Sequence, residues 1–99
     1  MHFMNPVPAM HLVELIRGIA TGEETFAQVR EMTLTLGKKP VAAEDFPAFI
    51  VNRILLPMIN EVMRCLDERV CTAADADLSV IAGLGFFGVL FLERLALML

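Results

Sequence analysis

Residues 2–18 read HFMNPVPAMHLVELIRG, and this run decides how the fold begins. Each proline in Asn5–Pro8 fixes its own φ and biases the residue before it away from helix, so this segment predicts a turn. Met1–Met4 reads as the end of one strand. His11–Arg17 reads as a second short strand, which Gly18 ends. We therefore expect two strands that the turn can bring side by side.

A helix is expected after these strands. Thr21 followed three residues later by Glu24 is a capping-box pattern. Gly37 is a suitable residue for the C-terminal end. Pro40–Ala43 then reads as a brief extended segment. Residues at helical spacing predict the buried face of this helix. They are Phe26, Val29, either Met32 or Thr33, and Leu36.

The second half of the chain predicts helices alone. Glu44–Pro47 is a polar, proline-bearing link. Ala48 to about Asp67 has apolar residues on more than one face and predicts the longest helix. Thr72 with Asp75 is an N-cap pattern, which predicts a short helix. That helix is expected to run through residue 82.

The expected fold class is an α/β segment followed by an all-α one, with one domain over residues 1–46 and another over 47–99. Apolar residues make up 57% of the chain, which argues against disorder. The net charge of -4 argues against a nucleic-acid partner, because such proteins need a basic face. Cys65 and Cys71 form no CxxC pair, and two thiols fit a reduced, cytoplasmic protein.

The C-terminal segment Leu78–Leu92 carries no charge. It is shorter than the roughly 20 residues that a spanning helix needs, and Glu93 and Arg94 interrupt it. We therefore expect a buried or interfacial segment and no membrane span. Peripheral membrane association through this apolar tail remains a weaker alternative.

Three side chains are candidates for chemistry. His2 carries an imidazole, which can take a proton from a hydroxyl group and return it. Glu14 could orient the imidazole and stabilise its charged form, if the turn brings the two strands together. Asn52, near the start of the long helix, offers both a donor and an acceptor. The alternative is a surface histidine, a surface glutamate and a solvated asparagine, and composition alone favours it.

The runs HFMNPVPAMHLVELIRG and FPAFIVNRILLPMINE resemble the L-3-hydroxyacyl-CoA dehydrogenases, in particular the 3-hydroxybutyryl-CoA dehydrogenase branch. The resemblance implies that His2 and Glu14 match the catalytic pair of the HFFNPVP and LVEVI stretches. It also implies that Asn52 matches the active-site asparagine of the DxPGFxxNR motif. Ala48 departs from that motif, which has glycine there, and a positive φ at this position would strain the alanine.

By the same resemblance, the chain holds the end of a Rossmann-type NAD-binding domain and the start of a helical dimerisation and substrate domain. The parent family uses NAD and acyl-CoA substrates. GLGFFG near the C-terminus has glycine spacing but lacks the strand–turn–helix context of a dinucleotide site, so we expect this chain alone to bind no NAD.

The sequence therefore leaves two alternative functions. The first is a partial NAD-dependent dehydrogenase that oxidises L-3-hydroxyacyl-CoA, inactive alone. The second is a non-catalytic helical fragment that forms homo-oligomers. The resemblance fades over residues 86–99, which the family motifs do not explain.

Overall fold

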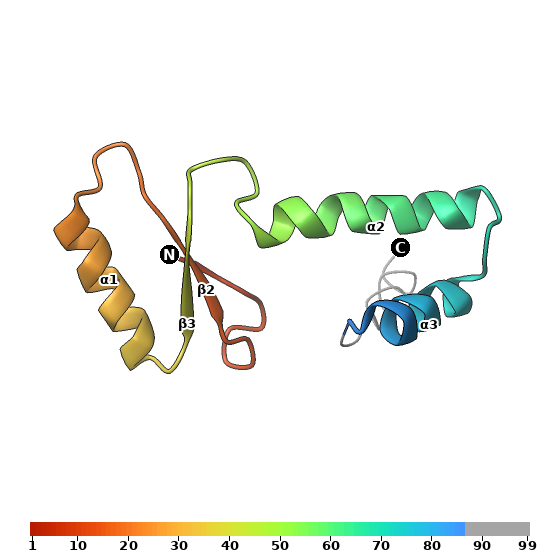
Figure 1. Cartoon of the computed structure of the whole chain (residues 1–99), viewed down its shortest axis with the longest axis horizontal. Helices are drawn as coiled ribbons and strands as arrows, with labels where there is room; N and C mark the ends of the chain where they lie inside the picture. Colours follow the sequence, from red (N-terminus) through yellow and green to blue (C-terminus); the bar gives the residue numbers. More distant parts are fainter. Residues whose placement is uncertain (87–99) are drawn as a thin grey trace. The chain divides into compact units, whose positions relative to one another are not determined.

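The computed structural model describes residues 1–86. Figure 1 shows the order of its elements along the chain. None of the described helices is long and apolar enough to cross a bilayer. Residues 87–92 of the segment Leu78–Leu92, and all of the divergent tail after Phe86, lie outside the described residues. The elements are β1 (His2–Phe3), β2 (Leu12–Ile16), α1 (Glu23–Thr35), β3 (Lys39–Ala43), α2 (Val51–Asp67) and α3 (Ala73–Leu84).

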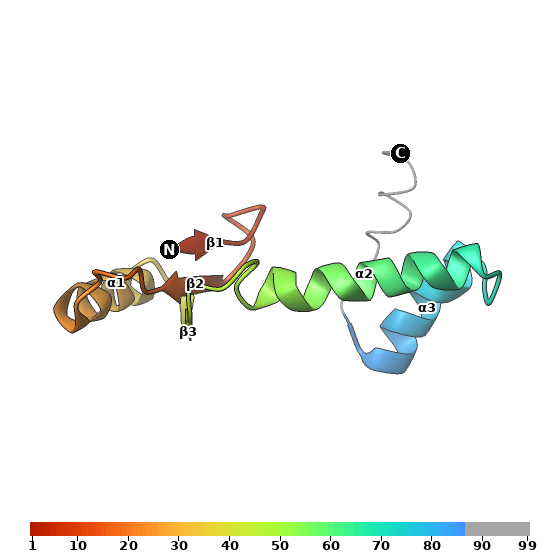
Figure 2. The same cartoon turned by 90° about the horizontal axis from the view of Figure 1, so that it is seen from above.

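The three strands form one sheet in the order β1-β2-β3. β1 runs antiparallel to β2, and Figure 2 shows their arrows pointing in opposite directions. β3 runs parallel to β2, which requires a crossover, and α1 supplies it. This α/β start followed by helices confirms the predicted fold class.

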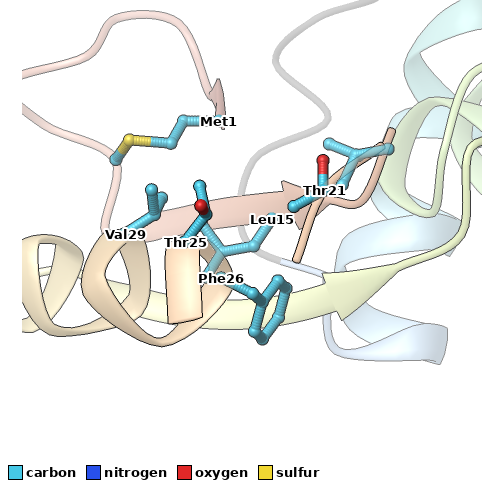
Figure 3. A pocket seen from close by; sticks show the side chains of 7 residues that line it. Met1, Leu15, Thr21, Thr25, Phe26 and Val29 are labelled. Atoms are coloured by element: carbon cyan, nitrogen blue, oxygen red, sulfur yellow. The ribbon is translucent and has the colours of Figure 1, made fainter. Parts of the chain in front are cut away.

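The middle strand β2 carries the core of this part of the chain. Val13, Glu14 and Leu15 are all buried, because β1 and β3 flank the strand and α1 packs against it. Successive strand residues point to opposite faces, so Val13 and Leu15 share one face and Glu14 has the other. Leu15 lies beside side chains of α1 (Figure 3), and Glu14 therefore points away from that helix.

The N-cap of α1 lies one residue later than predicted. The capping box of Thr21 and Glu24 is wrong, because Gly22 is the N-cap and makes no side-chain cap bond. The Thr21 hydroxyl instead accepts a hydrogen bond from the backbone N–H of Gly18, at 2.9 Å. The turn before the helix uses the hydroxyl that the capping box would have needed.

The buried face of α1 passes through Thr33, which settles the predicted choice between Thr33 and Met32. The Thr33 hydroxyl is satisfied by the carbonyl of Val29, at 2.8 Å. The helix ends at Thr35 with Leu36 as its C-cap, and Gly37 follows with a φ of 75°, as expected for a C-terminal stop. The N–H groups of Gly37 and Lys38 donate to carbonyls of the last turn, which is the Schellman arrangement.

α2 begins at Val51, three residues after the predicted start. The delay has a backbone cause, since Ala48 and Phe49 have φ values of 66° and 53° and cannot belong to a right-handed helix. The strain expected at Ala48 is therefore present. The helix then continues through Pro57 to Asp67.

α3 begins as predicted, with the Thr72 hydroxyl accepting from the backbone N–H of Asp75 at 3.1 Å. It ends two residues later than expected, at Leu84, where Gly85 adopts φ 71°. The chain divides into two compact units, of which the first is Met1–Leu55. The predicted domain boundary after residue 46 stays a prediction.

We predict that Ala48→Gly stabilises the protein. A left-handed alanine costs about 1–2 kcal/mol, and glycine removes that cost while adding some unfolded-state entropy. The free energy of unfolding should rise by about 1 kcal/mol, measured by urea denaturation with an unchanged m-value.

The matched control is Ala27→Gly, at an exposed position inside α1. There the same substitution should lower the free energy of unfolding by about 1 kcal/mol, because glycine is a poor helix former. A loss of stability in both variants would contradict the left-handed backbone at Ala48.

Candidate active site

The centre of the candidate site is the carboxylate of Glu14. This residue is fully buried in the middle strand, with β1 on one side and β3 on the other. A buried charge is costly unless it is paired and hydrogen-bonded. Both of its oxygens do have partners, and they come from segments far apart in the sequence.

The first partner is His2, directly across from Glu14 in the register of β1 and β2. Directly opposed residues of an antiparallel pair share one face of the sheet, which brings the two side chains together. The His2 Nδ1 lies 3.3 Å from the Glu14 Oε1. The prediction that the turn brings these side chains together is therefore confirmed by the geometry.

The second partner is the backbone N–H of Ile50, which donates to the Glu14 Oε2 at 2.8 Å. Ile50 immediately precedes α2, and the start of a helix carries partial positive charge that favours an anion. The left-handed residues Ala48 and Phe49 turn the chain just before this N–H. The carboxylate thus links the sheet to the beginning of α2.

His2 is held from a second side by an aromatic ring. The rings of His2 and Phe49 meet edge to face, with centroids 5.4 Å apart and planes at 61°. The His2 side chain is still 32% exposed, so a reactant can reach it. When Nδ1–H donates to Glu14, the neutral ring keeps Nε2 as the proton acceptor. The arrangement can act as an oriented general base and then as an acid.

Asn52 lies in the first turn of α2, two residues after Ile50, and is half-buried. Its side chain makes no hydrogen bond to the part of the chain that the structure describes. Its role in the site stays a prediction. His11 is exposed.

Sequence reasoning missed two contributors, the Phe49 ring and the Ile50 N–H. Neither could be found from side-chain chemistry, since one is an apolar ring and the other is main chain. The available signal was the departure from glycine at Ala48, which marked the backbone just before them as unusual.

The remaining features of residues 1–86 offer no competing site. No group of His, Cys, Asp and Glu among them could hold a metal ion. Gly83 and Gly85 of the GLGFFG run lie at the C-terminal end of α3, where carbonyls and not N–H groups are left over. The pocket in Figure 3 has no titratable side chain, and its lining consists of Met1, Leu15, Ile16, Thr21, Thr25, Phe26 and Val29.

Comparison with known proteins matches both parts of the chain to one family. The family described as "3-hydroxyacyl-CoA dehydrogenase, NAD binding domain" matches residues 1–46, and "3-hydroxyacyl-CoA dehydrogenase, C-terminal domain" matches residues 49–92. The 3-hydroxybutyryl-CoA dehydrogenase of Bradyrhizobium diazoefficiens is 65% identical over 69 residues, covering 70% of this chain and 24% of that protein. The human mitochondrial hydroxyacyl-coenzyme A dehydrogenase is 40% identical over 86 residues, covering 87% and 27%.

Solved structures give the same result. The (S)-3-hydroxybutyryl-CoA dehydrogenase from Ralstonia eutropha superimposes with a TM-score of 0.81 at 45% identity, covering 87% of this chain and 30% of that one. The chain thus spans about a quarter of the length of the curated relatives it matches. Two family matches that together reach from residue 1 to residue 92, and relatives of this similarity, show that the chain belongs to the 3-hydroxyacyl-CoA dehydrogenase family.

Proposed function

We propose that this chain supplies the proton-transfer half of an NAD-dependent dehydrogenase that interconverts L-3-hydroxyacyl-CoA and 3-oxoacyl-CoA. The observation that supports it is the buried Glu14 carboxylate, held between the His2 ring and the Ile50 N–H. A surface histidine and glutamate would need no such enclosure. The names of the relatives point to short acyl groups such as 3-hydroxybutyryl.

In the proposed reaction, the Nε2 of His2 takes the proton from the 3-hydroxyl group as the carbon–oxygen double bond forms. Glu14 accepts the Nδ1–H bond, fixes the ring in this tautomer and stabilises the positive imidazolium. Phe49 limits rotation of the ring. In the reverse direction the same nitrogen returns the proton to the alkoxide. Asn52 is proposed as a polar support for the substrate oxygen.

Alcohol oxidation also removes a hydride from the carbon, and NAD would accept it in this family. The described residues do not fit a dinucleotide. A pyrophosphate site needs N–H groups at the start of a helix after a strand, whereas Gly83 and Gly85 close a helix. We therefore infer that the chain acts only together with a dinucleotide-binding part.

A second candidate function is self-association through the helical part. α2 has no buried residue within the described chain. Surfaces with this many exposed apolar side chains are commonly covered by a partner, and a symmetric dimer is the commonest solution. The large exposed apolar residues of α2 and α3 include Leu56, Leu78 and Leu84, and Phe86 just beyond α3 is also exposed.

A chimera tests the catalytic proposal. The aligned segment of the Bradyrhizobium diazoefficiens relative is replaced by this chain, and the oxidation of 3-hydroxybutyryl-CoA is followed by NADH formation. We expect an active chimera in which His2→Ala lowers kcat by about 10²–10⁴-fold, the usual contribution of general acid–base catalysis. Glu14→Gln should lower it by a smaller factor.

The matched control is His11→Ala, which removes the other histidine of the chain and should leave kcat unchanged. An equal loss of kcat in the His2→Ala and His11→Ala chimeras would show that the substitutions disturb folding and that His2 has no specific role. Full activity in His2→Ala would refute the proposed base.

The isolated chain should show no saturable binding of NADH. The physical reason is that no GxGxxG turn joins a strand to a helix among the described residues, and the helix start that follows β2 carries Glu23 and Glu24, which disfavour a pyrophosphate. Isothermal titration of NADH into the chain measures it. Saturable binding in the micromolar range, about -8 kcal/mol, would contradict the inference that a dinucleotide-binding part must be added.

The isolated chain should also self-associate, because its helices leave large apolar side chains exposed. Sedimentation velocity over a wide concentration range should show a dimer that dissociates on dilution. Leu78→Glu, at an exposed position of α3, should weaken the dimer, whereas Ser79→Glu on the same helix should not. A soluble monomer at every concentration would rule the proposal out.

A further inference from the structure

The placement of His2 depends on a weak strand. β1 has only two residues, and two residue pairs define its register with β2. A shift by one residue would send His2 to the opposite face of the sheet, away from Glu14. Two pairs cannot by themselves fix the register firmly, so the connection between β1 and β2 must contribute. That connection is the loop of residues 4–11, which includes the NPVP segment.

This loop contains one helical turn. The N–H groups of Ala9 and Met10 both donate to the carbonyl of Pro6, at 3.1 and 3.2 Å. A single turn leaves its later carbonyls without partners inside the turn, as at the C-terminal end of any helix. These carbonyls are the natural acceptors for a cation.

The Lys38 ammonium occupies that position. Its Nζ donates to the carbonyl of Val7 at 2.8 Å and to the carbonyl of Met10 at 2.7 Å. An ammonium group has three donors, so one cation can hold both carbonyls at once. Hydrogen bonds from a charged donor are also stronger than neutral ones.

The base of the Lys38 side chain is itself fixed. The preceding Gly37 has φ 75°, and the Lys38 N–H donates to the carbonyl of Thr33 at 3.2 Å. Thr33 is fully buried in α1. The Lys38 side chain therefore extends from a rigid helix end to the loop, about thirty positions earlier in the chain.

We propose that Lys38 is a positioning residue, which clamps the 4–11 loop so that His2 stays opposite Glu14. The effect of this clamp on catalysis rests on the proposed function, whereas the clamp itself rests on the two hydrogen bonds from Lys38 to the loop. Lys38 touches neither His2 nor Glu14 and acts through the register of β1.

The neighbouring Lys39 provides a matched control. It has the same charge and is exposed, and its backbone N–H donates to the carbonyl of His11 at 2.7 Å. Lys39→Met keeps that backbone bond. Lys38→Met keeps an apolar stem of similar length but removes the ammonium group. Lys38→Arg restores a cationic donor.

The first experiment uses the unaltered chain. NMR scalar couplings across hydrogen bonds should link the Lys38 Nζ to the carbonyl carbons of Val7 and Met10, with the ammonium protons protected from exchange. A Lys38 ammonium signal that exchanges like that of Lys39, with no coupling, would overturn the clamp. This test needs no variant to fold and no activity.

The second experiment compares the variants. In Lys38→Met, nuclear Overhauser contacts between the His2 and Phe49 rings should weaken, and exchange of the Ile50 amide should speed up by about tenfold, the factor expected for losing a charged hydrogen bond. Lys39→Met should match the unaltered chain, and Lys38→Arg should recover most of the effect. Unchanged His2 contacts in a folded Lys38→Met chain would refute the positioning role.

The chimera then separates this proposal from the proposed function. Lys38→Met should lower kcat by about tenfold and leave KM nearly unchanged, because a misplaced base weakens proton transfer and not binding. Lys39→Met should leave both constants unchanged. An inactive chimera that keeps the clamp by NMR would defeat the function alone. An active chimera that is indifferent to Lys38→Met would defeat the positioning role alone.

Discussion

The arrangement of the first unit depends on one buried carboxylate. Glu14 has no exposed surface, and an unpaired charge in such a place would destabilise the fold by several kcal/mol. Its two oxygens must therefore find donors, and the donors come from β1 and from the residue before α2. This requirement joins three parts of the sequence around a single side chain. It also leaves the accessible His2 ring oriented for proton transfer.

The backbone around Ala48 illustrates what that requirement costs. Two consecutive left-handed residues are uncommon outside glycine, and each is strained. They delay the start of α2 until Val51 and set Phe49 against the His2 ring while the next N–H meets Glu14. The strain is offset by the second hydrogen bond to the buried Glu14 carboxylate, whose other oxygen faces His2. The strained turn therefore serves the proposed catalytic pair, because it places one neighbour against His2 and another against Glu14.

The loop of residues 4–11 adds a second layer of support. β1 is too short to determine its own register, whereas α1 is a helix of 13 residues whose end is fixed by Gly37 and Thr33. Lys38 transfers that rigidity to the loop through two carbonyl groups. The half-buried His2 is thus positioned directly by Glu14 and indirectly, through the loop, by the end of α1. The sheet, the crossover helix and the turn then act together on one imidazole ring.

Much of this chain could be predicted from local pattern, because prolines, glycines and apolar spacing act over a few residues. The NPVP turn, the strand around Glu14, the stop at Gly37 and the Thr72 cap all follow from such rules, and the structure contains them. His2 and Glu14 could be named as a pair from residue type and resemblance. The Thr21 capping box failed because the same hydroxyl had another donor nearby, which the pattern does not show.

What only the tertiary structure decided is which groups meet across long stretches of chain. The sequence cannot show that Ile50 offers its N–H to Glu14, because a main-chain group has no residue identity. Nor can it distinguish Lys38, whose ammonium reaches two carbonyls, from the adjacent and exposed Lys39. Residue type determines what a group can donate or accept. Its partner depends on distance in the folded chain. The sheet register and the strained turn at Ala48 and Phe49 set those distances.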